Sequence, residues 1–377
     1  MYLDKEYIQN YGGIHTYEEI LSQPKQWERV YELYLDRCDE IKNFLDALPK
    51  NVEIIFTGAG TSEYVGNIAS EYLKSLGTYN FKSIATTDLV ACPYLHFKKE
   101  KPTLLVSFAR SGNSPESLAA VELGEQIVDD FYNLAITCAP DGKLAEKLTA
   151  NEKSYVFIEP DGTNDKGFAM TSSFTSMLLT ALLIFDNRTA KKTLVQKLTE
   201  TGSVILNDSE QVERLVDFDF DRIVYLGSGP LYKLANEARL KVLELTAGEV
   251  ASLFESSMGF RHGPKSFVDK KTLIVSFISS NPYTRNYDLD ILNEISADKI
   301  AQKVIAVTNT EIDGDFDKLI YENDMDNDAY LAVCYILVGQ LISLVTSLRV
   351  GNSPDNPSKT GTVNRVVKGV TIHAYEK

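Results

Sequence analysis

Residues 52–62, VEIIFTGAGTS, decide the fold, because a run of apolar β-forming residues leads into a glycine turn that ends in two hydroxyl side chains. The following EYVGNIASEYLKSL has apolar residues at helical spacing, so the segment predicts a strand, a turn and a helix. Residues 14–48 upstream also show helical spacing, and Pro49 ends that helical region. Later runs, spaced as alternating strands and helices of a parallel sheet require, are TLLVSF (103–108), NLAITC (133–138) and SYVFIE (154–159).

The strand pattern repeats once along the chain. FTGAG begins at 56 and YLGSG at 225, an offset of 169 residues, and TLLVSF at 103 recurs as TLIVSF at 272 with the same offset. AIT at 135 returns as AVT at 306. The repeat predicts two tandem doubly wound α/β domains behind an N-terminal helical segment. The boundaries that follow are 1–48 for the helical segment, 49–210 and 211–350 for the domains, and 351–377 for a C-terminal tail.

Composition narrows the class of protein. The chain has 377 residues, of which 44% are hydrophobic and 24% charged, as expected of a folded protein with a substantial core. The net charge of −15 argues against nonspecific binding to nucleic acid. Four widely spaced cysteines without a CxxC pair suggest neither a disulfide framework nor a zinc knuckle, so we expect the reducing cytoplasm.

One apolar run raises the question of a membrane span. Residues 329–348 read AYLAVCYILVGQLISLVTSL, which is long enough to cross a bilayer. The run contains Gln340, Ser343 and Thr346, and the residues before it are acidic. We therefore expect a buried core or interface helix, with a transmembrane helix as the alternative, and no membrane partner.

Cofactor motifs are weak in this sequence. GAGTSEYVG lacks the GxGxxG spacing of a dinucleotide site, and no GxxxxGK[ST] or HExxH occurs. The four histidines, His15, His96, His262 and His373, are not at metal-ligand spacings. We expect neither a nucleotide cofactor nor a metal.

The two copies differ after their shared second strand. Copy one reads FARSGNSPES and copy two FISSNPYTRN, so only the first has a compact Ser-Gly-Asn-Ser turn before a helix. The hydroxyls of Ser111 and Ser114 and the turn's N–H groups suit a phosphate monoester. Thr61 and Ser62 open the preceding helix at the same edge of the sheet and offer further donors. The alternative is that these hydroxyls are ordinary helix caps.

Copy two carries what reads as an extra polar stretch, residues 241–267. It contains Glu244, Glu249, Glu255 and His262, the last in an Arg-His-Gly-Pro turn. A carboxylate and an imidazole are what proton transfer next to a carbonyl requires. The alternative is that the glutamates are solvated helix residues and the histidine is structural.

Five motifs together resemble the double sugar-isomerase (SIS) proteins: FTGAGTS, SFARSGNSPES, ARLKVLELTAGEV, FRHGP and VNRVVKGVTI. The resemblance covers nearly all of the chain after the helical segment. It points to the AgaS-type branch, the tagatose-6-phosphate ketose/aldose isomerases, whose members are implicated in galactosamine-6-phosphate deamination. The chain is also similar to the isomerase half of glucosamine-6-phosphate synthase. A flavodoxin-like sheet in each domain is the fold that this implies.

The resemblance also implies roles for individual residues. Glu244 in LKVLELT matches the glutamate that moves a proton between C1 and C2, and His262 in RHGP matches a ring-opening histidine that reaches a neighbouring subunit. Lys368 in VVKGVTI matches a lysine that closes over the substrate. The residues that match the phosphate cradle are Thr61, Ser62, Ser111 and Ser114.

Several positions stay open at this stage. Ala109 stands where many relatives have serine, so one phosphate hydroxyl is missing. Arg110 is either a phosphate-loop residue or a solvated surface residue, and Lys368 is either functional or a tail charge. Glu255 and Arg261 could touch substrate or form a structural ion pair.

The resemblance implies an enzyme that converts galactosamine 6-phosphate to tagatose 6-phosphate and ammonium by C1–C2 proton transfer and imine hydrolysis. A plain ketose/aldose-phosphate isomerase would use the same groups and stop one step earlier. A noncatalytic sugar-phosphate sensor is the third alternative, although the acidic chain disfavours one that binds DNA. We expect a small-molecule sugar phosphate as ligand and a homodimer or higher homo-oligomer as the assembly.

Overall fold

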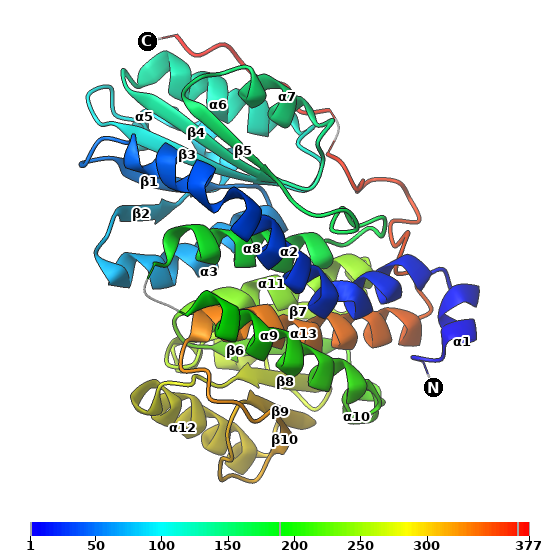
Figure 1. Ribbon diagram of the computed structural model, residues 1–377. Coiled ribbons are helices and arrows are strands. Elements are labelled where there is room, and N and C mark those ends of the chain that lie inside the picture. Colours follow the sequence, from blue (N-terminus) through cyan, green and yellow to red (C-terminus); the bar gives the residue numbers. More distant parts are fainter. Residues whose placement is uncertain (1, 188–189, 368, 377) are drawn as a thin grey trace. The chain divides into compact units, whose positions relative to one another are not determined.

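The chain forms two compact α/β units. The computed structural model describes residues 2–187, 190–367 and 369–376. Domain A comprises Gln26–Asp165, Ser172–Thr189 and Thr360–Lys377. Domain B comprises Met1–Lys25, Lys166–Thr171 and Ala190–Lys359. Each domain is built around one five-stranded parallel sheet (Figure 1).

The sheet of domain A has the strand order β2-β1-β3-β4-β5. Its strands are β1 (Glu53–Thr57), β2 (Asn80–Ser83), β3 (Thr103–Ala109), β4 (Phe131–Thr137) and β5 (Ser154–Ile158). All four pairings are parallel. Every residue of β1 and β3 is buried, which explains their nearly continuous apolar sequence in a sheet covered on both faces.

The sheet of domain B repeats this order as β7-β6-β8-β9-β10. Its strands are β6 (Arg222–Gly227), β7 (Ala251–Ser256), β8 (Thr272–Phe277), β9 (Lys303–Thr308) and β10 (Asp317–Ile320). The three matched segments of the sequence repeat form β1 and β6, β3 and β8, and β4 and β9, which hold equivalent places in the two sheets. The predicted fold class of two tandem doubly wound parallel sheets is confirmed.

Helices cover both faces of the sheet in domain A. They are α3 (Thr61–Leu73), α4 (Thr86–Ala91), α5 (Pro93–His96), α6 (Pro115–Ile127), α7 (Lys143–Thr149) and α8 (Ser172–Phe185), with a short 3-10 turn η1 (Lys74–Leu76). Figure 1 shows α5, α6 and α7 on one face and α3 and α8 on the other. All residues of α8 are buried, as expected of a helix that has no charged side chain.

Domain B has the same layered build. Its helices are α1 (Lys5–Asn10), α9 (Lys191–Asn207), α10 (Ser209–Val216), α11 (Pro230–Leu245), α12 (Pro282–Asp298) and α13 (Asp328–Arg349), with 3-10 turns η2 (Gly259–Arg261) and η3 (Pro264–Phe267). In Figure 1, α11 and α13 lie on one face of the sheet and α12 on the other. Because the strands of each sheet are parallel, their carboxyl ends and the loops that follow them lie at one edge of each sheet.

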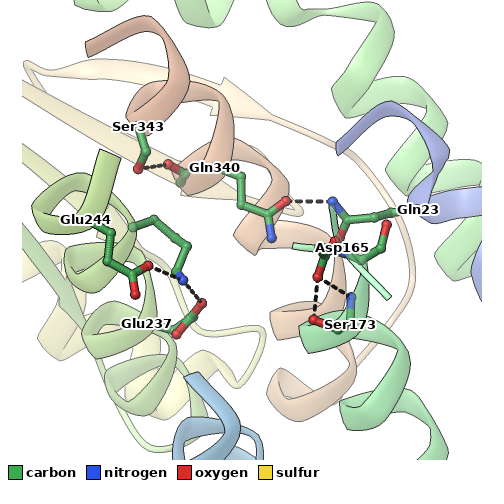
Figure 2. A network of polar contacts seen from close by, with 10 residues as sticks. Gln23, Asp165, Ser173, Glu237, Glu244, Gln340 and Ser343 are labelled. Carbon is green, nitrogen blue, oxygen red and sulfur yellow. Dashed lines mark hydrogen bonds and ion pairs between the residues drawn. The ribbon is translucent and has the colours of Figure 1, made fainter. Parts of the chain in front are cut away.

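Helix α13 is long and apolar enough to cross a membrane. Its most apolar stretch is completely buried, and the helix packs against α9, α10 and α11. Inside this core, Gln23 Nε2 donates to Gln340 Oε1 at 2.6 Å and Ser343 Oγ donates to the Gly339 carbonyl at 2.7 Å (Figure 2). Gln340 and Ser343 thus each have a hydrogen-bond partner within the protein, and the complete burial of the stretch confirms the prediction of a buried core helix.

The N-terminal helical segment consists of α1 and the 33-residue α2 (Ile14–Asp46), whose interior contains Pro24. The tail after α13 continues to the end of domain A, where Tyr375 packs against the hydrophobic core. Gln126 Nε2 donates to the Tyr375 carbonyl at 2.9 Å. From Thr360 on, the tail thus belongs to domain A.

The stretch 241–267 differs from the sequence-based expectation. It was expected to be an addition specific to copy two, but it contains β7, which pairs with β6 as β2 pairs with β1. The strand was missed because ASLFES has neither a clear alternation nor a dense apolar run, and none of its residues is fully buried. Its edge position explains that composition.

Candidate active site

The turn between β1 and α3 presents Thr61 and Ser62. They are the first two residues of α3, follow Gly60 at φ 58°, and are both buried. A Cβ on Gly58 would lie 2.4 Å from the carbonyl carbon of Ser62, so glycine is required for this close approach. The turn directs the N-terminal N–H groups of α3 toward the carboxyl end of the sheet, where an anion would be stabilised.

The turn between β3 and α6 presents Ser111 and Ser114. Gly112 has φ 62°, and Ser114 is the extended residue directly before α6. The loop is bonded to the turn between β4 and α7, because the N–H of Lys143 donates to Asn113 Oδ1 at 3.2 Å. Ser114 Oγ lies 2.6 Å from Ser117 Oγ.

The two turns lie at the same edge of the sheet, because β1 and β3 are hydrogen-bonded neighbours and parallel. The structure therefore brings the four predicted phosphate residues to adjacent strand ends in one domain: Thr61, Ser62, Ser111 and Ser114. Phosphate binding by them stays a prediction.

Arg110 is a buried residue, so the sequence alternative of a solvated surface arginine is wrong. Its Nη2 donates to the carbonyl of Arg365 in the C-terminal tail at 2.8 Å. Arg365 in turn donates to Asn164 Oδ1 at 3.1 Å. The phosphate-loop candidate is therefore connected to the tail, whereas Lys368, three residues further on, lies outside the described residues.

Glu244 lies in the last turn of α11 and is paired with a buried lysine. Lys241 Nζ lies 2.6 Å from Glu244 Oε2 and 3.4 Å from Glu237 Oε1 (Figure 2). The side chains of Lys241 and Glu237 are almost fully buried, whereas 26% of the Glu244 side chain is exposed. Burial lowers the pKa of Lys241, but the charges of Glu237 and Glu244 outweigh it and raise that pKa overall. A charged ammonium thus fixes one carboxylate oxygen of Glu244.

Sequence reasoning missed the contribution of Lys241 and Glu237, although both lie near or within the motif ARLKVLELT. Residues 237, 241 and 244 are four and three positions apart, so they share one face of α11. That spacing was the available signal. A buried lysine between two glutamates holds the position of the partly exposed one.

His262 lies between η2 and η3 and is exposed. Its neighbours in the chain are held by one carboxylate of α12, because Arg261 Nε lies 2.6 Å from Glu294 Oε2 and Lys265 Nζ 2.5 Å from Glu294 Oε1. Arg261 is therefore in a structural ion pair. Among the residues that the structure describes, the His262 side chain makes no hydrogen bond or ion pair.

Glu255 and Glu249 are the two other glutamates that the sequence singles out in the stretch 241–267. Glu255 Oε1 accepts from the N–H of Ser256 at 2.7 Å, which caps the end of β7. Glu249 is exposed after the end of α11. Over 2–187, 190–367 and 369–376, no cluster of three or more His, Cys, Asp or Glu residues is arranged to hold a metal ion.

Two tandem domains with the same parallel strand order define a doubly wound α/β protein, a class that binds its ligands at the carboxyl ends of the strands. The SIS domain model matches residues 48–186 and again 218–348. The chain therefore belongs to the SIS domain family.

Three relatives each cover 97% or more of this chain. D-galactosamine-6-phosphate deaminase AgaS of Shewanella sp. (strain ANA-3) is 43% identical, over 100% of this chain and 96% of the relative. A Clostridium novyi NT protein proposed to be a tagatose-6-phosphate ketose/aldose isomerase has 43% identity and a TM-score of 0.95, with 99% and 98% of the two chains covered. Tagatose-6-phosphate ketose/aldose isomerase of Escherichia coli has 40% identity and a TM-score of 0.90, with 97% and 98% covered.

Proposed function

We propose that this protein is an amino-sugar-phosphate deaminase that converts D-galactosamine 6-phosphate to tagatose 6-phosphate and ammonium. The observation that carries the proposal is the 43% identity to the Shewanella deaminase over the whole of this chain. The paired Glu244 and Lys241 supply a group suited to the proton transfer that this reaction needs.

The phosphate of the substrate is bound in domain A in this proposal. Ser111, Ser114, Thr61 and Ser62 contribute hydroxyls and helix N-terminal N–H groups at neighbouring strand ends. Ala109 leaves the cradle one hydroxyl short of many relatives, and the buried Arg110 adds a positive charge next to the loop. The acidic chain thereby attracts a dianion locally despite its net charge of −15.

Glu244 carries the proton in the proposed reaction. Once the ring is open, its carboxylate removes the proton from C2 of the amino sugar. The electrons of that C–H bond form a C1–C2 double bond, and the aldehyde oxygen takes up a proton from solvent, giving an enolamine. The same proton is returned to C1, and the electron pair of the nitrogen forms a C2 imine. Water adds to C2 and ammonia leaves, which gives the ketose phosphate. Lys241 supports these steps because its ammonium keeps the Glu244 carboxylate oriented.

His262 opens the sugar ring in this scheme, across the interface of a homodimer or higher homo-oligomer. Its exposure, and the absence of side-chain partners for it among the described residues, support a role completed by a second subunit. Lys368 is proposed to close over the substrate. Four cysteines without disulfides suit the cytoplasm, where we place the protein.

A second candidate is plain ketose/aldose isomerisation of tagatose 6-phosphate, which the names of the Clostridium and Escherichia relatives favour. One assay separates the two. Ammonium and ketose phosphate are measured in parallel with galactosamine 6-phosphate, glucosamine 6-phosphate and tagatose 6-phosphate as substrates. The deaminase releases one ammonium for each ketose formed from galactosamine 6-phosphate. Isomerised tagatose 6-phosphate without ammonium from either amino sugar would replace the proposal with the second candidate.

A further inference from the structure

Domain B repeats the strand-end turns that form the candidate phosphate site of domain A. The glycine before α3, Gly60, has φ 58° and ψ −127°, and the glycine before α11, Gly229, has φ 54° and ψ −126°. The turn after β8 stands where the turn after β3 stands in domain A. Ser280 follows Ser111 at the offset of 169 residues that relates the two copies. The backbone of an anion cradle is thus present twice.

In domain B, three hydrogen-bond donors at the strand ends are bound to the side chain of Asp288. This fully buried residue of α12 accepts from Ser228 Oγ at 2.6 Å and Ser257 Oγ at 2.5 Å through Oδ1, and from Ser279 N at 3.0 Å through Oδ2. The three donors follow β6, β7 and β8. One internal carboxylate therefore joins three adjacent strand ends.

A second carboxylate takes the remaining donors. Asp328, the first residue of α13, accepts from Ser280 N at 2.8 Å and Ser280 Oγ at 2.7 Å through Oδ1, and from Ser279 Oγ at 2.5 Å through Oδ2. Ser280 is the counterpart of Ser111, so Asp328 holds the hydroxyl and N–H that correspond to those of the proposed phosphate loop. Arg285 supports this loop, since its Nε and Nη2 donate to the carbonyls of Ser279 and Ser280.

Among the described residues of domain A, the corresponding places carry neither carboxylate. The turn of α6 that corresponds to Asp288 carries the buried apolar residues Ala119, Ala120 and Val121. Helix α8, the counterpart of α13, begins with Ser172 instead of an aspartate. Asp165 of domain A binds the start of α8, with Ser172 N donating to its Oδ1 at 2.8 Å, and so caps a helix.

We infer that domain B contains a second anion cradle, which Asp288 and Asp328 keep filled, so that a phosphate-bearing ligand binds only in domain A. The two carboxylates accept six hydrogen bonds from the cradle. They are part of the same domain, so an anion from solution would have to compete with groups that are always present at the site. Removing the Asp328 carboxylate leaves the N–H and hydroxyl of Ser280 for a small dianion such as inorganic phosphate. That a phosphate binds in domain A rests on the proposed function. That the carboxylates fill the cradle of domain B does not.

The test is an anion rescue of the full chain. Asp328→Ala should lower the Tm by about 5 °C, and inorganic phosphate should raise the Tm of this variant by about 3 °C more than that of the wild type. Asp269→Ala is the matched control. Asp269 accepts from Lys271 N and Thr272 Oγ1, both at 2.9 Å, in the turn before β8 and not at a helix N-terminus. Phosphate should raise the Tm of this control no more than that of the wild type.

Calorimetric titration with inorganic phosphate gives the number of sites. The wild type should bind one phosphate per chain and Asp328→Ala two. Should the domain A site fail, the counts become zero and one, and the difference of one still supports the filled cradle. Equal counts for the two proteins, or equal rescue of Asp269→Ala, would overturn the inference. Asp328→Ser, which keeps a helix-capping side chain, takes the place of the alanine variant if that variant does not fold.

Discussion

Glu159 makes the stability of domain A depend on pH in an unusual direction. The residue follows β5 and is buried. Burial raises the pKa of its carboxyl to about 8, from an ordinary value of 4.5, while the neighbouring Thr180 hydroxyl lowers it in part. The native protein therefore keeps this carboxyl protonated at neutral pH, whereas the unfolded chain releases the proton.

The sign and size of the effect follow from these values. Between pH 4.5 and about 8 the unfolded state binds fewer protons than the native state at this group, so rising pH favours unfolding. The stabilisation is fully present below pH 4.5 and is lost as pH rises through about 8. An interval of roughly 3.5 pH units at about 1.4 kcal/mol per unit corresponds to about 5 kcal/mol.

Glu159→Gln tests this reasoning, because the amide keeps the shape of the protonated carboxyl but does not titrate. The free energy of unfolding is measured by urea titration of variant and wild type from pH 4.5 to 9. The difference, variant minus wild type, should increase by about 5 kcal/mol over this range. Glu152→Gln, at an exposed position just before β5, should give no such trend. Parallel curves for Glu159→Gln and the wild type would refute the reasoning.

Three further predictions concern the proposed reaction. Replacing Ser111 and Ser114 together by alanine should raise KM for sugar phosphates by about tenfold or more, and unchanged KM and phosphate inhibition would move the anion site elsewhere. Lys241→Met should lower kcat by about 100-fold, since it removes the cation between two glutamates, and kcat near wild type in a folded variant would exclude its positioning role. Mixing inactive Glu244→Gln and inactive His262→Ala chains under subunit exchange should restore part of the activity, and verified heterodimers without activity would contradict a shared site.

The sequence predicted the fold because its repeat fell on the buried central strands. β1, β3 and their counterparts β6 and β8 are apolar on both faces, so the fold constrains nearly every residue in them and the match between copies is visible. β7 lies at a sheet edge with half-exposed residues, where little constrains the sequence, and it was taken for an added segment.

The candidate site could be predicted only in part. Glu244 was identified through a motif, but its pairing with Lys241 depends on side-chain direction and burial within α11. The contact of Arg110 with Arg365 joins residues 255 positions apart, for which the local sequence carries no signal. Asp288 and Asp328 likewise belong to no sequence motif, because their role depends on the donors at the strand ends that their carboxylates bind in the folded domain.

The central claim is that Glu244 transfers the proton in an amino-sugar-phosphate deaminase. Its most direct test is ammonium release from galactosamine 6-phosphate by wild type and Glu244→Gln, with sugar-phosphate affinity measured for both proteins by calorimetry. The account predicts ammonium release by the wild type, none above background by the variant, and affinities within about tenfold of each other, or roughly 1.4 kcal/mol. Turnover by Glu244→Gln near that of the wild type would contradict it.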